Sequence, residues 1–174
     1  MLQPLQTPEH DRDVDLAPDF RDALSRLASS VVLVTCWIDG RPWGMTVTAF
    51  ASVSATPPTV LVSLGEETRA ARAISRTRRF GVDILGETHE AAARHSSRPG
   101  AVKYLDDFVD RTATRDVSPA LAGTLGHLDC EVIDTIQAAD HILFLARVRA
   151  ARSSRTETAP LLYHRRRFRR LAAD

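Results

Sequence analysis

The densest run of small polar residues in the chain covers residues 44–54 and reads GMTVTAFASVS. An extended segment of this composition exposes backbone N–H and C=O groups together with hydroxyls, and no bulky side chain shields them. A flat heteroaromatic ring could therefore hydrogen-bond its edge to this backbone. An ordinary amphipathic strand with threonine and serine on its solvated face would give the same pattern. The pattern alone leaves both interpretations open.

A second candidate site is the segment GEETR, residues 65–69, directly before a predicted helix. A helix N-terminus carries unpaired N–H groups and a partial positive charge, and both suit a phosphate. The hydroxyl of Thr68 and the guanidinium of Arg69 could add a donor and a cation. The alternative is a plain threonine N-cap with two acids that stabilise the first turn.

Two further groups of residues could bind charged ligands. Asp140 and His141 form an acid and imidazole pair at a predicted turn, where the acid can orient the ring for binding or proton handling. Such a pair can also do no more than satisfy the turn. Five arginines occupy positions 165–167, 169 and 170. They could bind the phosphates of a diffusing nucleotide or an acidic partner, or they could keep a strand edge solvated.

Several common catalytic motifs are missing from the sequence. It contains no Gly-x-Gly-x-x-Gly, Walker sequence, zincin histidine pair or Gly-x-Ser-x-Gly. The six histidines are scattered and none has metal-ligand spacing, so we expect no metal site. Cys36 and Cys130 match no metal or redox spacing. They indicate buried strand thiols in a reducing cytoplasm.

The composition is that of one globular domain. The chain has 174 residues, of which 44% are hydrophobic, with 23 basic and 22 acidic side chains. The net charge of +1 argues against a general nucleic-acid binder. No apolar run approaches the roughly 18–20 residues that span a bilayer, and the start lacks the pattern of a secretory signal. We expect a soluble cytoplasmic domain.

The hydrophobic patterning predicts a mainly β fold. Residues 1–18 are polar and contain three prolines, which predicts a flexible N-terminal arm followed by one domain over residues 19–174. Asp19 could cap a helix with apolar positions at 20, 23, 24 and 27. Two more helices are predicted over 68–76 and 88–95. Strands are predicted over 31–38, 43–50, 59–64, 80–85, 126–136 and 142–150, and the chain closes with the short segments 161–164 and 167–171.

These strands favour a small antiparallel barrel. Asp39 and Gly40 predict a tight hairpin between the first two long strands. About six or seven strands with three short helices are typical of such a barrel, which also removes exposed sheet edges. The segment 96–124 is rich in serine, proline and glycine. It predicts a long connection of the kind that is usually functional.

The order of these segments resembles that of the short-chain flavin reductase family, the small components of two-component flavin-dependent monooxygenases. The resemblance covers roughly residues 20–171. It is carried by FRxAL at 20–24, SVVLVT at 30–35, GMTVTAFASVS at 44–54, PP at 57–58, FGVDIL at 80–85, CEV at 130–132, DHI at 140–142 and PLLY at 160–163. No single segment is decisive, but the collinear series is specific.

The resemblance implies a split β-barrel that forms a homodimer, with flavin held near the dimer interface. It also implies an NAD(P)H:flavin oxidoreductase that transfers hydride from NADH or NADPH to FMN or FAD. Such an enzyme supplies reduced flavin to a separate monooxygenase. Two alternatives stay open, namely a flavoprotein of this fold that holds its flavin tightly and acts on its own substrate, and a non-catalytic flavin-binding module.

Carried over position by position, the resemblance also assigns site residues. The isoalloxazine ring and ribityl chain would contact Thr46, Val47, Thr48, Ala49, Ser52, Val53 and Ser54. The flavin phosphate would contact Thr68 and Arg69, and Lys103 would also reach the flavin. Asp140 belongs to the cofactor site, and His141 is the expected catalytic residue, which positions the nicotinamide. The chain departs from the family pattern at Ala139 and Arg167, where glycine is usual.

Overall fold

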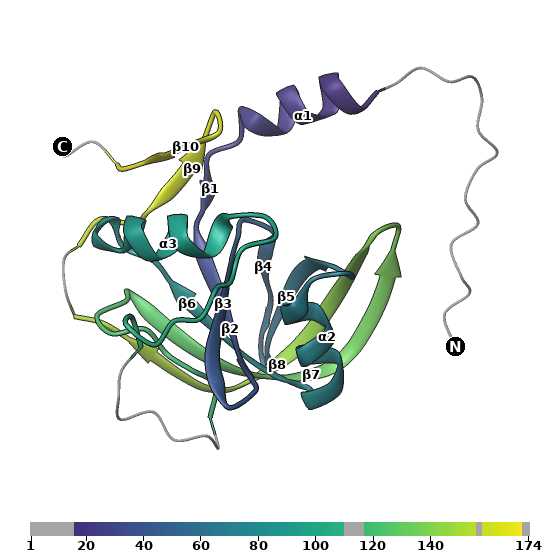
Figure 1. The fold of residues 1–174 in the computed structure, drawn as a ribbon, viewed down its shortest axis with the longest axis vertical. Coiled ribbons are helices and arrows are strands. Elements are labelled where there is room, and N and C mark those ends of the chain that lie inside the picture. Colours follow the sequence, from purple (N-terminus) through teal and green to yellow (C-terminus); the bar gives the residue numbers. More distant parts are fainter. Residues whose placement is uncertain (1–15, 110–116, 156–157, 172–174) are drawn as a thin grey trace.

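The computed structural model describes residues 16–109, 117–155 and 158–171, and it is built mainly from antiparallel strands (Figure 1). The helices are α1 (Ala17–Ser25), α2 (Arg69–Thr77) and α3 (Glu90–Ser97), with a short 3-10 helix η1 (Glu87–His89). The strands are β1 (Ser29–Ser30), β2 (Val32–Ile38), β3 (Arg41–Val47), β4 (Phe50–Ala55), β5 (Pro58–Gly65), β6 (Arg79–Ile84), β7 (Gly126–Ala138), β8 (His141–Ser153), β9 (Leu162–His164) and β10 (Arg167–Arg169). The prediction of a mainly β fold with short helices is confirmed.

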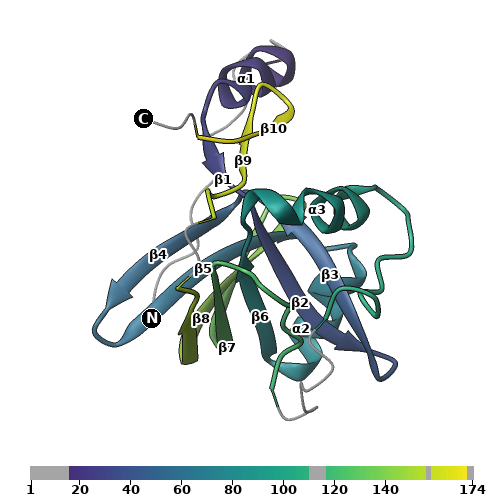
Figure 2. The ribbon, with the colours of Figure 1, turned by 90° about the vertical axis from the view of Figure 1, so that its left-hand side faces the viewer.

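Two sheets organise the described residues. Seven strands form the larger sheet in the order β3-β2-β6-β7-β8-β5-β4, and β1, β9 and β10 form a smaller one. Figure 2 shows α1 and the smaller sheet projecting from one end of the larger sheet. The centre of the larger sheet is the long β7–β8 hairpin, whose strands have 13 residues each.

The turn between β2 and β3 is the one that the sequence predicts. Asp39 and Gly40 have φ values of 53° and 74°. Both values are positive, as in a type I′ turn, for which Asp-Gly is a preferred pair. The turn fixes the register, so that Ile38 pairs with Arg41 and Val32 pairs with Val47.

The larger sheet is not closed among the described residues, so it keeps edge strands at β3 and β4 that a closed barrel would remove. Among the strands, β3 pairs only with β2 and β4 pairs only with β5, although Trp43 of β3 also forms an isolated bridge with Tyr104. The predicted strand over 43–50 is in fact two strands, because the backbone leaves the β2 ladder after Val47 and joins β5 at Phe50. Thr48 and Ala49 lie at this crossing and belong to neither ladder.

The core has two parts, one under each of the packed helices. Helix α2 buries Ala70, Ala71, Ala73 and Ile74 against sheet residues such as Phe144. The second part lies beneath α3 and contains Leu33, Leu85, Leu105 and Leu161. Leu105 belongs to the predicted long connection, so this connection contributes to the core as well as to the surface.

Helix α1 differs from its prediction. Its N-cap is Leu16 and no side chain caps it, so Asp19 lies inside the first turn instead of preceding it. None of its residues is buried, and the side chain of Phe20 is 61% exposed. An apolar stripe shows that a helix has a face to cover, but it does not identify the surface that covers it.

The predicted arm, residues 1–18, falls almost wholly outside the described residues, and α1 begins at Ala17, inside that range. Within the described ranges, no helix is long and apolar enough to cross a membrane.

Candidate functional site

A pocket of about 480 Å³ opens where β3 crosses to β4. Its walls come from β3, β5, β8, helix α3 and the β9–β10 hairpin. It is lined by Val31, Met45, Thr46, Val47, Thr48, Ala49, Ser63, Gly65, Arg94, Ser97, His141, Tyr163, Arg166, Arg167 and Phe168. This volume lies within the range of pockets that hold cofactors and other small molecules, about 300–1,000 Å³.

The wall formed by residues 46–49 offers backbone donors. Thr48 O accepts from Phe50 N and Ala49 O accepts from Ser63 N, but among the described residues no acceptor faces the N–H of Thr48 or Ala49. The hydroxyl of Thr46 donates to Ala93 O at 2.7 Å and is therefore used within the fold. Two neighbouring residues that line the pocket thus have backbone N–H groups without an acceptor in the described part of the chain.

His141 lines the same pocket at the start of β8. Its Nδ1 lies 2.7 Å from Asp140 Oδ1, and the side chain is 48% exposed. The hydrogen bond from His141 lowers the pKa of the Asp140 carboxyl. Asp140 itself lies in the β7–β8 turn and does not line the pocket. Ala139, which also lies in this turn, has a positive φ of 52°.

Thr68 caps α2, which agrees with the alternative interpretation of the segment 65–69 as an ordinary threonine N-cap. Its hydroxyl accepts from Ala71 N at 3.1 Å and donates to Gly65 O at 2.8 Å. Glu66 accepts from Gln137, and neither Glu66 nor Glu67 lies in the first turn of α2. Thr68 does not line the pocket, although the neighbouring Gly65 does.

Arg69 and Lys103 lie outside the pocket, on the side of the molecule near the β2–β3 turn. The guanidinium of Arg69 is 3.1 Å from Asp39 and 4.6 Å from the centroid of the Trp43 ring. Lys103 O accepts from Gly44 N, and partial burial lowers the pKa of the Lys103 ammonium. Arg69 therefore joins helix α2 to the hairpin that carries Trp43.

Ser52, Val53 and Ser54 lie on the edge strand β4 and do not line the pocket. The side chain of Val53 is 54% exposed, and Ser54 Oγ accepts from Thr56 N. The structure thus brings residues 46–49 together with His141, and it sets the seven other predicted contacts outside this pocket.

The pocket also contains residues that the predicted site lacks. Arg94 and Ser97 come from α3, and Tyr163, Arg166, Arg167 and Phe168 come from the C-terminal hairpin. The run of arginines near the C-terminus was the available signal for two of them. Nothing in the sequence of α3 points to a site.

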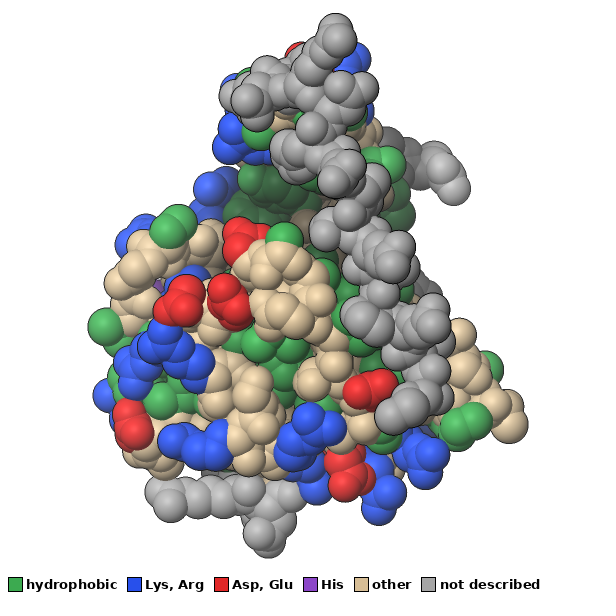
Figure 3. Space-filling view, turned by 90° about the vertical axis from the view of Figure 1, so that its right-hand side faces the viewer, with side chains coloured by type: hydrophobic (Ala, Val, Ile, Leu, Met, Phe, Trp, Pro, Cys, Tyr) green, Lys and Arg blue, Asp and Glu red, His purple; other side chains and the backbone are tan. Residues whose placement is uncertain are grey.

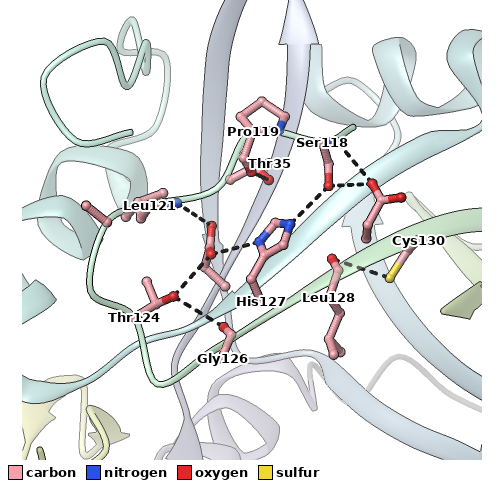
Figure 4. Close-up of polar contacts among 12 residues, drawn as sticks. Thr35, Ser118, Pro119, Leu121, Thr124, Gly126, His127, Leu128 and Cys130 are labelled. Atoms are coloured by element: carbon pink, nitrogen blue, oxygen red, sulfur yellow. Dashed lines mark hydrogen bonds and ion pairs between the residues drawn. The ribbon is translucent and has the colours of Figure 1, made fainter. Parts of the chain in front are cut away.

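A second polar cluster lies buried among β6, β7 and the segment 117–124, and none of its residues lines the pocket (Figure 4). Asp83 and His127 face each other as a cross-strand pair of β6 and β7, and Asp83 Oδ1 lies 2.9 Å from His127 Nδ1. Asp83 also accepts from Leu121 N and Thr124 Oγ1. Burial raises the pKa of Asp83, although these hydrogen bonds oppose the shift.

Ser118, His127 and Asp83 follow one another in space like the serine, histidine and aspartate of a hydrolase triad. They cannot act as one, however. Ser118 Oγ lies 3.3 Å from His127 Nε2 but donates at 2.7 Å to Asp129, and all these side chains are buried. A nucleophile must be reachable by substrate, and this one is not. The cluster instead attaches the segment 117–124 to β6 and β7. Gly81 of β6 lies next to this cluster. A Cβ at Gly81 would lie 2.4 Å from the hydroxyl of Thr35, so only glycine fits at this position.

Comparison with known proteins gives consistent results. A family model described as "Flavin reductase like domain" matches residues 24–172. The reductase component of a 4-nitrophenol 4-monooxygenase/4-nitrocatechol 2-monooxygenase from Rhodococcus opacus is 36% identical over 168 residues, which cover 97% of this chain and 83% of that protein. An NADH-dependent flavin reductase from Pseudomonas fluorescens is 34% identical over 152 residues, 86% of each chain.

Solved structures agree with these matches. An NADH:FAD oxidoreductase of Streptomyces globisporus, in complex with NAD and FAD fragments, has a TM-score of 0.83 and 29% identity to this chain. The match covers 94% of this chain and 99% of that one. The resemblance predicted from the order of the sequence segments is therefore confirmed: the chain belongs to the flavin reductase-like domain family.

Proposed function

We propose that this chain is an NAD(P)H-dependent flavin reductase, which transfers hydride from NADH or NADPH to FMN or FAD and supplies reduced flavin to a partner monooxygenase. The observation that carries the proposal is the pocket lined by Thr48, Ala49 and His141, where the N–H groups of Thr48 and Ala49 have no acceptor among the described residues. The names of the relatives from Rhodococcus opacus and Pseudomonas fluorescens support the same reaction.

The residues of the pocket fit a flavin. A tricyclic ring with carbonyl and nitrogen acceptors along one edge needs adjacent donors, and the crossing from β3 to β4 supplies two backbone N–H groups. When bound, the nicotinamide dinucleotide supplies the hydride and the flavin supplies its acceptor, so the protein needs no general acid or covalent nucleophile. Fixed donors at the acceptor edge stabilise the negative charge that develops there.

His141 acts by positioning. Its Nδ1 is engaged by Asp140 at 2.7 Å, which orients the imidazole and leaves Nε2 without a partner among the described residues. A group held in this way can hold the carboxamide of a nicotinamide against the flavin. Alignment of two reactants in a near-attack geometry accounts for a large part of many rate enhancements.

A homodimer is part of the proposal. Leu16, Phe20, Leu24 and Leu27 on or beside α1 are each 48–66% exposed, and Ile133 and Ile136 of β7 are about half exposed. Figure 3 shows hydrophobic side chains in the recess between the α1 end of the molecule and the larger sheet. Exposed apolar side chains gathered in this way are typical of an interface. In the dimer, we propose that Ser52, Val53 and Ser54 of the edge strand complete the flavin site.

The remaining predicted contacts are proposed with narrower roles. Thr68 holds the turn beside Gly65, and we propose that Arg69 and Lys103 contact the flavin phosphate from the side of the β2–β3 turn. We also propose a cytoplasmic location, which two free and buried thiols support. Burial raises the pKa of Cys36 and of Cys130 to about 12, so neither is a reactive thiolate.

Oxidation of NADH and NADPH by the purified chain, with and without added FMN or FAD, tests the proposal. Turnover that requires added flavin is the expected result, and the preferred pair of substrates identifies the cofactors. Flavin that stays bound through desalting would favour a flavoprotein with its own substrate. Flavin binding without NAD(P)H oxidation would favour a non-catalytic module.

Light scattering, which measures the mass of the particle in solution, tests the homodimer. The mass of a monomer would contradict it.

A further inference from the structure

Three arginines line the pocket, one from helix α3 and two from the β9–β10 hairpin. Arg94 lies on α3, Arg166 lies in the β9–β10 turn and Arg167 begins β10. We call these three side chains the arginine rim. No aspartate or glutamate is among the described residues that line the pocket. The rim therefore gives the pocket a positive charge.

The turn that carries Arg166 holds its residues in a conformation that arginine disfavours. Arg165 and Arg166 have φ values of 48° and 59°, the pattern of a type I′ turn. The β2–β3 turn has the same pattern but uses Asp39 and Gly40, which suit it. The chain thus keeps arginine where glycine would form the turn more easily. Strain retained at a binding pocket points to a role for the side chain that carries it.

Most of the charge on the rim is not neutralised within the described residues. Arg94 pairs with Glu90 at 2.7 Å and its guanidinium lies 5.0 Å from the centroid of the Phe168 ring. Arg166 and Arg167 form no ion pair in the described part of the chain, whereas the nearby Arg170 lies 3.4 Å from Glu87. Two guanidinium groups at the pocket therefore have no anionic partner there.

We infer that the arginine rim is a phosphate-binding subsite for a nucleotide that occupies this pocket. Guanidinium groups bind phosphate oxygens through paired, charge-assisted hydrogen bonds. Tyr163 and Phe168 line the same pocket and supply apolar surface beside the charges. The inference rests on the proposed function for the type of ligand, because nicotinamide dinucleotides and flavin nucleotides both carry phosphates.

Calorimetric titration with inorganic pyrophosphate at low ionic strength tests the rim directly. We expect Arg166→Gly and Arg167→Gln each to weaken binding by about tenfold or more. Arg166→Gly is informative because glycine suits a positive φ, so it removes the guanidinium while the thermal unfolding midpoint stays the same or rises. Arg169→Gln is the matched control, since it removes a charge from the same hairpin outside the pocket, and it should bind as the wild type does.

A second set of titrations identifies the source of the phosphate. Weaker binding of FMN with unchanged binding of riboflavin in the rim variants would assign the subsite to the flavin. Weaker binding of NADP⁺ with unchanged binding of FMN would assign it to the dinucleotide. Either result supports the subsite. Unchanged affinity for pyrophosphate, FMN and NADP⁺ in both variants would overturn it, as would an equal loss in Arg169→Gln.

The subsite and the proposed function can fail separately. If the wild type oxidises NAD(P)H but the rim variants bind pyrophosphate, FMN and NADP⁺ as tightly as the wild type does, only the subsite is contradicted. Absence of NAD(P)H oxidation by the wild type, together with pyrophosphate binding that depends on Arg166 and Arg167, would contradict the proposed function and leave the subsite supported.

Discussion

Two pairs of the same side-chain types occupy opposite environments in this molecule. Asp83 and His127 lie 2.9 Å apart with both side chains buried, while Asp140 and His141 lie 2.7 Å apart with both exposed. Burial raises the pKa of Asp83, and the hydrogen bond from His141 lowers that of Asp140. The local geometry is nearly the same, so the surroundings decide what each pair does.

The buried pair has every polar neighbour that it needs, and the exposed pair does not. Asp83 also accepts from Leu121 N and Thr124, which close the cluster from the segment 117–124. Among the described residues, the ring of His141 hydrogen-bonds only to Asp140, and its other nitrogen has no partner there. A saturated buried cluster stabilises one structure, whereas an incompletely satisfied imidazole at a pocket can bind a ligand.

Removal of the buried carboxylate should have the largest effect. Asp83→Ala leaves His127 Nδ1 and Leu121 N without the carboxylate that accepts from them, which should destabilise the fold by about 3–5 kcal/mol. Urea unfolding measures this loss. Asp140→Ala is the matched control, and its unfolding midpoint should be unchanged. Equal losses in the two variants would remove the distinction between the pairs.

Titration of the same carboxylate should have a smaller effect, because it changes the charge but leaves the side chain in place. Since burial raises the pKa of Asp83, the folded state holds this proton more tightly than the unfolded state does. The contribution of Asp83 to stability is therefore complete below its unfolded pKa and is lost as pH rises through its folded pKa. The stability of the wild type relative to Asp83→Asn should fall as the pH rises above about 4, the value typical of an unfolded aspartate. A rise over this range would contradict the assignment.

Removal of the exposed imidazole should change binding without changing stability. His141→Ala should raise the KM for NADH or NADPH about tenfold, with a smaller change in kcat and no change in thermal midpoint. His127→Ala provides the contrast, since it should lower the thermal midpoint strongly. An unchanged KM and kcat in His141→Ala would exclude a role for His141 in the site.

The smallest effect should come from the turn beside the exposed pair. Ala139 has a φ of 52°, where a Cβ costs roughly 1 kcal/mol and glycine costs little. Ala139→Gly should raise the free energy of unfolding by about 1 kcal/mol or less. Steady-state kinetics would then show whether the alanine also tightens the placement of His141. A loss of stability in this variant would mean that the turn is not strained.

Local patterns predicted the local structure, and long-range pairing decided the rest. Asp39 and Gly40 predicted their turn because both residues suit the backbone that the turn requires. The placement of His127 opposite Asp83 depends on the register between β6 and β7, which residues 44 positions apart do not reveal. The partner of Arg69 likewise depends on how α2 packs beside the β2–β3 turn.

The candidate site was predictable to a similar degree. The segment 46–49 and His141 stand out by composition and by their place in the family pattern, and the structure brings them to one pocket. Arg94 could not be predicted, because a charged residue on an exposed helix face has the same pattern whether or not a pocket lies beside it. Phe20 and Leu24 show the complementary problem, since their periodicity predicts a covered face but not its covering.

Helix α1 has a consequence for how the molecule fluctuates. It buries no residue, and the N–H of Arg165 donates to Ser25 O at its C-terminal end at 2.6 Å. An element held so lightly opens locally at little cost, so its amide protons should exchange with deuterium far faster than those around Asp83. Any partner that covers α1 also immobilises Ser25 and the turn that carries Arg166. Protection of α1 and affinity at the pocket are then linked, and each must strengthen the other to the same degree.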